Sequence, residues 1–286
     1  MSAPAGVAGS RDVAGSTADA VVARGLAGSD AVTLEELDAT AALQTRVDRK
    51  YVLTPAEVAA LLAALTSGAA HSAPRVLEID GDRSFTYAST YYDTADLLTF
   101  RQAARRRRRR FKVRTRTYVD TGNTTFLEVK TRAARGVTVK ERCPWELAAP
   151  LEGAGLEFVD DRLTAACLDA PPSAELAPVL RSVYRRTTVL LPDARLTLDA
   201  GLRWRLDGRD HPDGADTPDD RTADVGDLVV VETKAGTAPS SADRALWRAG
   251  HRPDRISKYA TGLATLRPDL PDHPWRRLRR RRLGVA

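Results

Sequence analysis

Cysteine is scarce in this 286-residue chain, which contains only Cys143 and Cys167. With no close pairing and no histidine at metal-ligand spacing, these two thiols predict neither a disulfide framework nor a zinc site. Such cysteine usage suits a reducing compartment, so we expect a cytoplasmic protein. Histidine is also rare and scattered, and we assign no catalytic or metal-binding role to any of the four. They are His71, His211, His251 and His273.

Long apolar runs are absent too, and no segment approaches the roughly 20 consecutive apolar residues that a membrane-spanning helix needs. The first 32 residues are rich in Ala, Gly and Ser, and Arg24 interrupts their apolar stretch, so they make a poor signal peptide. We expect residues 1–32 to be a disordered tail. Residues 269–286, which include the run Arg276 to Arg282, are expected to be a basic tail without order. Residues 33–268 are long enough for one large domain.

Positive charge is in excess, with 44 Lys and Arg against 38 Asp and Glu and a net charge of +6. This excess favours anionic partners and leaves nucleic acid, phosphate chains and membrane surfaces open. The run Arg105 to Arg110 invites a nucleic-acid interpretation, but no aromatic stacking platform accompanies it. We therefore interpret the run as a solvated loop or a basic funnel, and we expect no specific nucleic-acid partner. For the C-terminal basic tail, electrostatic attachment to RNA or anionic lipid stays a similar alternative.

Helices are predicted by capping signals and by apolar residues at helical spacing. Residues 54–57 (Thr-Pro-Ala-Glu) form a capping box with proline at the first helical position, and apolar residues at 58, 61, 62 and 65 continue the helix. Asp93 is interpreted as the cap of a further short helix. Other helices are predicted from residue 33, over 156–180 with a break at two prolines, and over 241–249 and 257–266.

Strands are predicted where the apolar period changes to two. Residues 120–123 (Asp-Thr-Gly-Asn) supply a turn between two strands, and consecutive strands indicate an antiparallel meander. The predicted extended segments are 46–53, 85–92, 111–147 with this turn inside it, 183–191, 194–198 and 227–234. A polar loop is predicted over 207–224.

Six of these strands separate charge from apolar side chains, because successive residues of a strand point to opposite faces. The charged faces carry nine basic residues, Lys112, Arg114, Arg116, Lys130, Lys140, Arg142, Arg186, Arg195 and Lys234, and three acidic residues, Glu128, Asp199 and Glu232. An ordinary sheet with its charged face in water is one interpretation. Like charges on neighbouring strands repel, however, and an anionic ligand would remove that repulsion. The alternative is a barrel with the charged face inward and helices such as 58–65 and 256–266 on its apolar outside.

Nine short motifs follow one another along the chain. They are Arg46-Val-Asp-Arg-Lys50-Tyr51, Ser89-Thr-Tyr-Tyr-Asp93, Lys112-Val-Arg114-Thr-Arg116, Glu128-Val-Lys130, Lys140-Glu-Arg142, Tyr184-Arg-Arg186, Arg195-Leu-Thr-Leu-Asp199, Glu232-Thr-Lys234 and Ser257-Lys258-Tyr259. In this order the set resembles the VTC domain (vacuolar transporter chaperone type), the polyphosphate polymerase branch of the CYTH-like triphosphate tunnel metalloenzymes. The resemblance covers about residues 34–266.

The resemblance implies an α+β fold, a closed antiparallel eight-stranded β-tunnel with helices packed outside. It also implies an enzyme that transfers the γ-phosphoryl group of ATP onto inorganic polyphosphate and releases ADP, with Mn²⁺ or Mg²⁺ as cofactor. Together with the charged strand faces, it gives the catalytic candidates Lys50, Arg114, Arg116, Lys130, Arg186, Arg195 and Lys258. The substrate-binding candidates are Arg46, Lys140, Tyr184, Ser257, Lys112, Arg142 and Lys234. The metal candidates are Glu232 and Glu128.

General chemistry supports such a site, because phosphoryl transfer needs mainly positioning and charge neutralisation rather than a protein nucleophile. The wider superfamily opens with Glu-x-Glu-x-Lys, whose glutamates bind metal, whereas the aligned residues here are Arg46, Asp48 and Lys50. This reduced acidic pair favours a polymerase over a triphosphate hydrolase, which stays the second hypothesis. A polyphosphate-binding module without turnover is the third. Glu232 argues against it, because a pure anion receptor has little use for a carboxylate among arginines.

Overall fold

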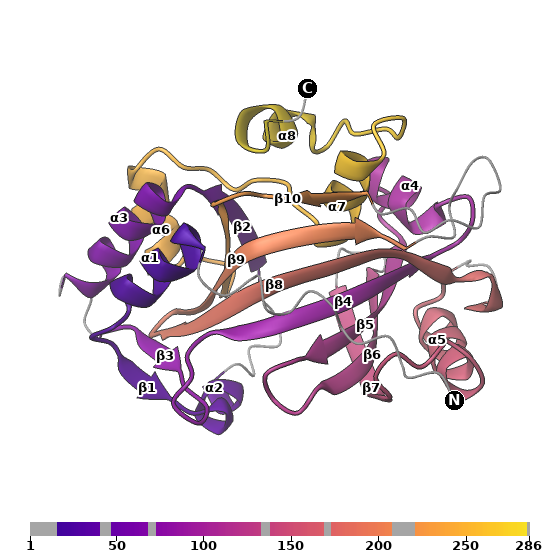
Figure 1. Cartoon of the computed structure of the whole chain (residues 1–286), viewed down its shortest axis with the longest axis horizontal. Coiled ribbons are helices and arrows are strands. Elements are labelled where there is room, and N and C mark those ends of the chain that lie inside the picture. The colour runs from indigo at the N-terminus through magenta and orange to yellow at the C-terminus, as the bar shows by residue number, and fades with distance from the viewer. Residues whose placement is uncertain are drawn as a thin grey trace.

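One curled sheet organises the chain (Figure 1). The computed structural model describes residues 16–40, 47–67, 73–132, 138–168, 173–207 and 221–284. Its strands are β1 (Asp30–Val32), β2 (Val47–Leu53), β3 (Arg75–Leu77), β4 (Phe85–Asp93), β5 (Arg110–Tyr118), β6 (Thr124–Arg132), β7 (Thr138–Trp145), β8 (Ala177–Leu191), β9 (Ala194–Leu206), β10 (Thr222–Asp224) and β11 (Val229–Ala235). Its helices are α1 (Thr17–Gly25), α2 (Leu34–Thr40), α3 (Pro55–Thr66), α4 (Leu98–Ala104), α5 (Ala154–Ala165), α6 (Ser241–Arg248), α7 (Lys258–Leu266) and α8 (Arg276–Arg282). None of these helices is long and apolar enough to cross a membrane.

Eight strands form the main path of the sheet in the order β2-β11-β9-β8-β4-β5-β6-β7, and every neighbouring pair is antiparallel. The antiparallel meander predicted around the turn at residues 120–123 is confirmed as β4-β5-β6-β7, and the main path has the eight antiparallel strands that the resemblance implied. Within the described residues no pairing joins β7 to β2, so the sheet is an open half-barrel and the expected closed tunnel is wrong. Alternation in a sequence shows that a sheet has a charged face, but closure depends on strand tilt and stagger, which the pattern does not encode.

The apolar outer face of the sheet packs against helices as predicted. Leu196, Leu198 and Val231, which alternate with the charged positions of β9 and β11, share one buried cluster with residues of α1, α3 and α6. Val113 and Val129 share a second buried cluster with residues of α5. The capping box at the start of α3 is present, with its apolar residues buried against the first cluster.

Residues 16–32 contain helix α1 and strand β1, so the expectation that they are disordered is wrong. Ser16 caps α1, and the helix buries Ala18, Val22 and Leu26 against α3 and the sheet. Gly25 lies so close to α3 that a Cβ there would be 2.5 Å from Leu62 Cδ1. The Ala-rich and Gly-rich composition that suggested disorder instead permits this close helix–helix approach.

Helix α7 lies on the charged side of the sheet, not on the outside as we expected. Val230 is two residues from Glu232 on β11 and so shares its face. It packs in one buried cluster with Tyr259 and Leu263 of α7. Gly262 permits this contact, because a Cβ there would be 2.5 Å from the Trp204 ring. The apolar stripe of α7 predicted a buried helix, and only the tertiary structure shows which face of the sheet it covers.

Two further expectations need correction in the second half of the chain. Residues 269–284 include helix α8, which buries Trp275 and Leu278 and holds Arg279 against Asp272 at 2.7 Å, so this segment is not a disordered tail. The predicted helix over 156–180 ends at Ala165 as α5, and β8 already begins at Ala177. The two prolines of that prediction lie outside the described residues.

Candidate functional site

The register of the sheet places the charged positions of its strands on one face, which we call the basic face. Lys112 pairs with Lys130 across β5 and β6, and Lys130 pairs with Lys140 across β6 and β7. At the other end of the sheet, Glu232 of β11 pairs with Lys50 of β2. The basic face comprises Lys50, Lys112, Arg114, Arg116, Glu128, Lys130, Lys140, Arg142, Tyr184, Arg186, Arg195, Asp199, Glu232 and Lys234, with Ser257 and Lys258 contributed by the start of α7.

The curl of the sheet brings its two ends within electrostatic reach of each other. The pKa of Lys130 on β6 is lowered by burial and by the charge of Lys50 on β2, while Asp48 of β2 acts in the opposite direction. β2 and β6 are six places apart in the strand order. The basic face is therefore the inside of the half-barrel, although its edge strands do not pair.

Each of the three acids of the basic face is held by bases. Glu128 accepts hydrogen bonds from Arg114 Nε at 2.8 Å and from Lys140 Nζ at 3.2 Å. Arg186 donates to both oxygens of Asp199, at 2.6 and 2.8 Å, and Lys258 forms an ion pair with the same carboxylate. Both carboxylates are almost completely buried, so they fix the arginines in place rather than remaining available to a ligand.

Glu232 accepts a hydrogen bond from Lys50 Nζ at 2.8 Å. Burial alone would raise the pKa of Glu232, but the charges of Lys50, Lys234 and Arg186 overcome this and hold it well below its usual range. The same balance of burial against neighbouring cations lowers the pKa of Asp199 to about 2. Both carboxylates are therefore ionised at neutral pH.

Five bases of the basic face have no ion pair within the described part of the chain: Lys112, Arg116, Lys130, Arg142 and Lys234. Burial, reinforced by the charges of Lys130 and Lys50, lowers the pKa of Lys112 to about 7. Burial also lowers the pKa of Lys234 to about 7, against the attraction of Glu232. A lysine whose pKa is lowered this far is buried among other cations with too few carboxylates to balance them. Such an environment is typical of a binding site.

Helix α7 brings two polar residues of its first turn to the basic face. Lys112 donates to Ser257 Oγ at 2.8 Å, and Ser257 also caps the helix. Tyr259 anchors the same turn by donating to Asp93. Asp93 in turn accepts from the backbone N–H groups of Thr99 and Phe100, at 2.8 and 3.0 Å, which confirms its predicted role as the cap of α4. The motifs around Asp93 and Ser257 therefore position α7.

Tyrosines separate the arginines at the middle of the basic face. The rings of Tyr87 and Tyr184 stack with centroids 5.5 Å apart. The guanidinium groups of Arg116 and Arg186 lie 5.5 and 5.1 Å from the centre of the Tyr87 ring. Arg116 also donates to the Tyr184 hydroxyl at 3.2 Å. These cation–π contacts hold both guanidinium groups without neutralising them.

A row of buried polar groups was missed by reasoning from charge. Arg116, Ser89, Ser182 and Trp204 are direct register partners across β5, β4, β8 and β9. Arg116 Nε, both serine hydroxyls and Trp204 Nε1 are buried without a hydrogen-bond partner. Buried polar groups are normally satisfied, so four unpartnered groups in one row are unusual, and Trp204 Nε1 of this row lies beneath Gly262 of α7. Ser89 lies between Tyr87 and Tyr91 on one face of β4, and this small polar residue between two tyrosines was the sequence signal that could have revealed the row.

The acids of the basic face fit a divalent cation only in part. Among the described residues no group of three or more His, Cys, Asp or Glu side chains is gathered to hold a metal. Magnesium-like ions are commonly held by one or two carboxylates together with substrate phosphates and water. Glu232 fits such a site. Glu128 fits poorly, because Arg114 and Lys140 occupy its two oxygens.

The remaining candidates differ in their surroundings. Arg142 is exposed on the edge strand β7, where its guanidinium lies 4.4 Å from the centre of the Phe126 ring. Arg195 reaches Asp38 of α2 at 4.0 Å, and its charge contributes to the low pKa of Lys234. Arg46 lies outside the described residues.

Solved structures with related chain paths are distant in sequence. A Bacillus halodurans protein described as an adenylate cyclase is 12% identical, with a TM-score of 0.45 over 75% of this chain and 94% of its own. HpAC1 from Hippeastrum, named as an adenylyl cyclase with a dominant triphosphatase activity, is 17% identical, with a TM-score of 0.41 over 76% of this chain and 94% of its own. Protein PH1819 from Pyrococcus horikoshii is 12% identical, with a TM-score of 0.39 over 74% and 94% of the two chains.

A comparison with curated protein sequences gives no match. The family described as VTC domain, in contrast, matches residues 45–267, which is most of the chain and contains nearly all of the basic face. The chain belongs to the VTC domain family.

Proposed function

We propose that this protein is a metal-dependent phosphoryl transferase that binds ATP and polyphosphate along the basic face and extends the polyphosphate chain. In each cycle a terminal oxygen of the chain attacks the γ-phosphorus of ATP, the bond to the β-phosphate oxygen breaks, and ADP leaves. The observation that carries the proposal is the set of five bases that form no ion pair within the described residues, on a face where Glu128, Asp199 and Glu232 are already paired with other bases. Family membership supports it.

The side chains of the basic face would work by positioning and charge neutralisation. A linear phosphate chain presents negative oxygens at regular intervals, and the pairs of basic residues on neighbouring strands provide matching positive charge. Phosphoryl transfer is accelerated by groups that hold donor and acceptor in line and neutralise developing charge. Arg186 and Lys258 are already fixed by Asp199, so they would need little reorganisation when substrate binds.

Mn²⁺ or Mg²⁺ is the proposed cofactor, and Glu232 is the residue that would hold it together with substrate phosphates. When bound, the ion would supply charge neutralisation at the oxygens of the transferred group. The Asp48 carboxylate belongs to the same end of the basic face, because it interacts electrostatically with Lys50 and Lys234. Asp48 thus adds a second negative charge at the end of the basic face that contains Glu232.

The proposal is tested by incubating purified protein with ATP and Mn²⁺ and separating the phosphate products by gel electrophoresis. Long chains with release of ADP support the proposal. Free phosphate instead would make the protein a triphosphate hydrolase, and tight polyphosphate binding without turnover would make it a binding module. The double variant Lys112→Gln/Lys234→Gln should lose synthesis, while Arg280→Gln/Arg281→Gln, which removes two exposed charges from α8, should retain it.

A further inference from the structure

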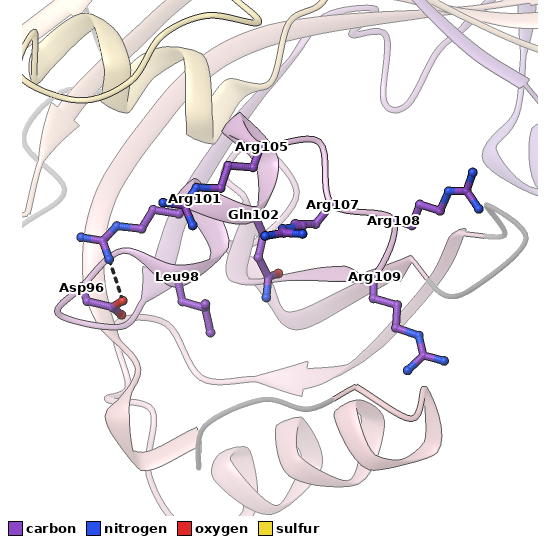
Figure 2. Close-up of a pocket in the computed structure, with 8 residues that line it drawn as sticks. All are labelled: Asp96, Leu98, Arg101, Gln102, Arg105, Arg107, Arg108 and Arg109. Atoms are coloured by element: carbon purple, nitrogen blue, oxygen red, sulfur yellow. Dashed lines mark hydrogen bonds and ion pairs between the residues drawn. The ribbon is translucent and has the colours of Figure 1, made fainter.

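A pocket rich in arginine lies where α4 leads into β5 (Figure 2). Its volume is about 380 Å³, which is within the range of roughly 300–1,000 Å³ typical of small-molecule sites. The lining residues are Asp96, Leu98, Arg101, Gln102, Arg105, Arg107, Arg108 and Arg109. A basic funnel that steers anions requires positive charge but no cavity. The pocket among these arginines therefore indicates a role beyond steering.

Hydrogen bonds hold the backbone of this connection in place. The N–H group of Arg106 donates to Ala103 O at 3.1 Å, and that of Arg107 donates to Gln102 O at 2.9 Å. Arg110 closes the turn by donating from its guanidinium to Arg107 O at 2.7 Å. Arg106 adopts a left-handed backbone conformation at this turn, with a φ of 55°. The arginines therefore project from a fixed backbone.

The charge of the pocket is strongly unbalanced. Its one acid, Asp96, is already paired with Arg101 at 3.0 Å. Arg105, Arg107, Arg108 and Arg109 are exposed, and none of them makes an ion pair with any residue that the structure describes. Four unpaired guanidinium groups around one hollow repel one another unless an anion lies between them. Gln102 Oε1 is buried there without a partner.

The pocket lies next to the end of the basic face. Arg110, the next residue along the chain, shares a strand face with Lys112 and pairs in register with Arg132 on β6. Burial and the charge of Arg132 lower the pKa of Arg110, so these two cations are close together. Basic side chains thus run along this face from Lys130 and Lys112 to Arg110 and Arg132, and the pocket begins at the neighbouring residue, Arg109.

We infer that the arginine pocket is an outer subsite for a linear polyphosphate chain, which binds the part of the chain that extends beyond the basic face. The inference rests on the proposed function. Arg110 and Arg116 are six residues apart on one strand, a span of about 20 Å, which three linked phosphates cannot bridge. The pocket should therefore bind long chains and leave tripolyphosphate unaffected. No aromatic residue lines it, which disfavours single-stranded nucleic acid.

The test compares tripolyphosphate with polyphosphate of about one hundred units by calorimetry without metal at physiological salt. The variant is Arg107→Gln/Arg108→Gln/Arg109→Gln, and the control Arg277→Gln/Arg280→Gln/Arg281→Gln removes the same charge from exposed positions of α8. The pocket variant should bind the long chain about tenfold more weakly, as expected for three exposed ion pairs. It should bind tripolyphosphate normally, and the control should bind both as the wild type does.

Three results would overturn the inference. They are equal losses for both ligands, equal losses in the pocket variant and the control, and a loss of affinity for single-stranded RNA of equal charge that is larger than the loss for the long polyphosphate. Failure of the proposed function looks different, because then the wild-type protein itself would form no long phosphate chains from ATP, or would bind neither phosphate ligand.

Discussion

Replacing Glu232 by Gln should separate the role of this acid as an ion-pair partner from its proposed role in holding a metal. The change keeps the shape of the side chain and its ability to accept from Lys50 Nζ, which lies 2.8 Å away. It removes the negative charge. Because the pKa of Glu232 is held far below its usual range, chiefly by Lys50 against the effect of burial, no accessible pH produces the same change in the wild type.

The cost in stability should be small. The Lys50 side chain is 29% exposed and that of Glu232 is 11% exposed, so water can compensate part of the lost pair. We expect the free energy of unfolding to fall by about 1–2 kcal/mol, near the lower end for a hydrogen bond to a charged group. Turnover that depends on Mn²⁺ should fall at least about 100-fold, because the anchor of the ion is gone.

Affinity for polyphosphate without metal should rise. A carboxylate about 5 Å from a phosphate charge repels it by up to about 3 kcal/mol at an effective dielectric constant of about 20. Screening by Lys50 reduces this, so we expect about five- to tenfold tighter binding. The assays are urea unfolding, calorimetry without metal and ATP turnover with Mn²⁺.

The matched control is Glu128→Gln, which breaks another buried ion pair of the basic face, with Arg114 and Lys140. It should lower stability without abolishing the response to Mn²⁺. Turnover of Glu232→Gln within about threefold of the wild type, a small fraction of the loss expected for a metal anchor, would remove Glu232 from the metal site. An equal loss in both variants would show that the arrangement of the ion pairs, not metal binding, is responsible.

Three more predictions concern the basic face and the helix above it. Arg116→Ala should weaken tripolyphosphate binding by about 1.5–3 kcal/mol with little change in melting temperature. Arg114→Ala should lower both the affinity for tripolyphosphate and the melting temperature, because it leaves the buried Glu128 carboxylate with one base fewer. Equal melting temperatures of the two variants would refute this. The two lysines whose pKa is about 7 bind fewer protons in the folded than in the unfolded protein between pH 7 and their ordinary pKa of 10.5. Their contribution to stability should rise with pH across that window, and tripolyphosphate should bind with proton uptake near its lower end, seen as a dependence of the calorimetric heat on buffer. Gly262→Ala should lower the free energy of unfolding by about 1–3 kcal/mol, because the new Cβ would meet the Trp204 ring at 2.5 Å; an unchanged urea midpoint would show that α7 is not packed on this face.

The sequence by itself determined which side chains share a face. Strand alternation has a fixed period, so the bases of β5, β6, β8 and β11 could be assigned to one side without knowing their neighbours. The resemblance of the ordered motifs identified the family, and the match over residues 45–267 agrees with it. Capping signals likewise located α3 and the role of Asp93, because they depend only on residues close in sequence.

Tertiary structure decided what alternation cannot encode. Which base pairs with which acid follows from register and rotamer, so the pairing of Glu232 with Lys50 rather than Lys234 could not be predicted. Composition suggested a disordered N-terminal tail, but α1 is stabilised by burial against α3, which is a long-range effect. The open edge of the sheet and the position of α7 on its charged side depend on how distant segments pack. Packing of that kind is fixed by three-dimensional fit and not by the local pattern of residues.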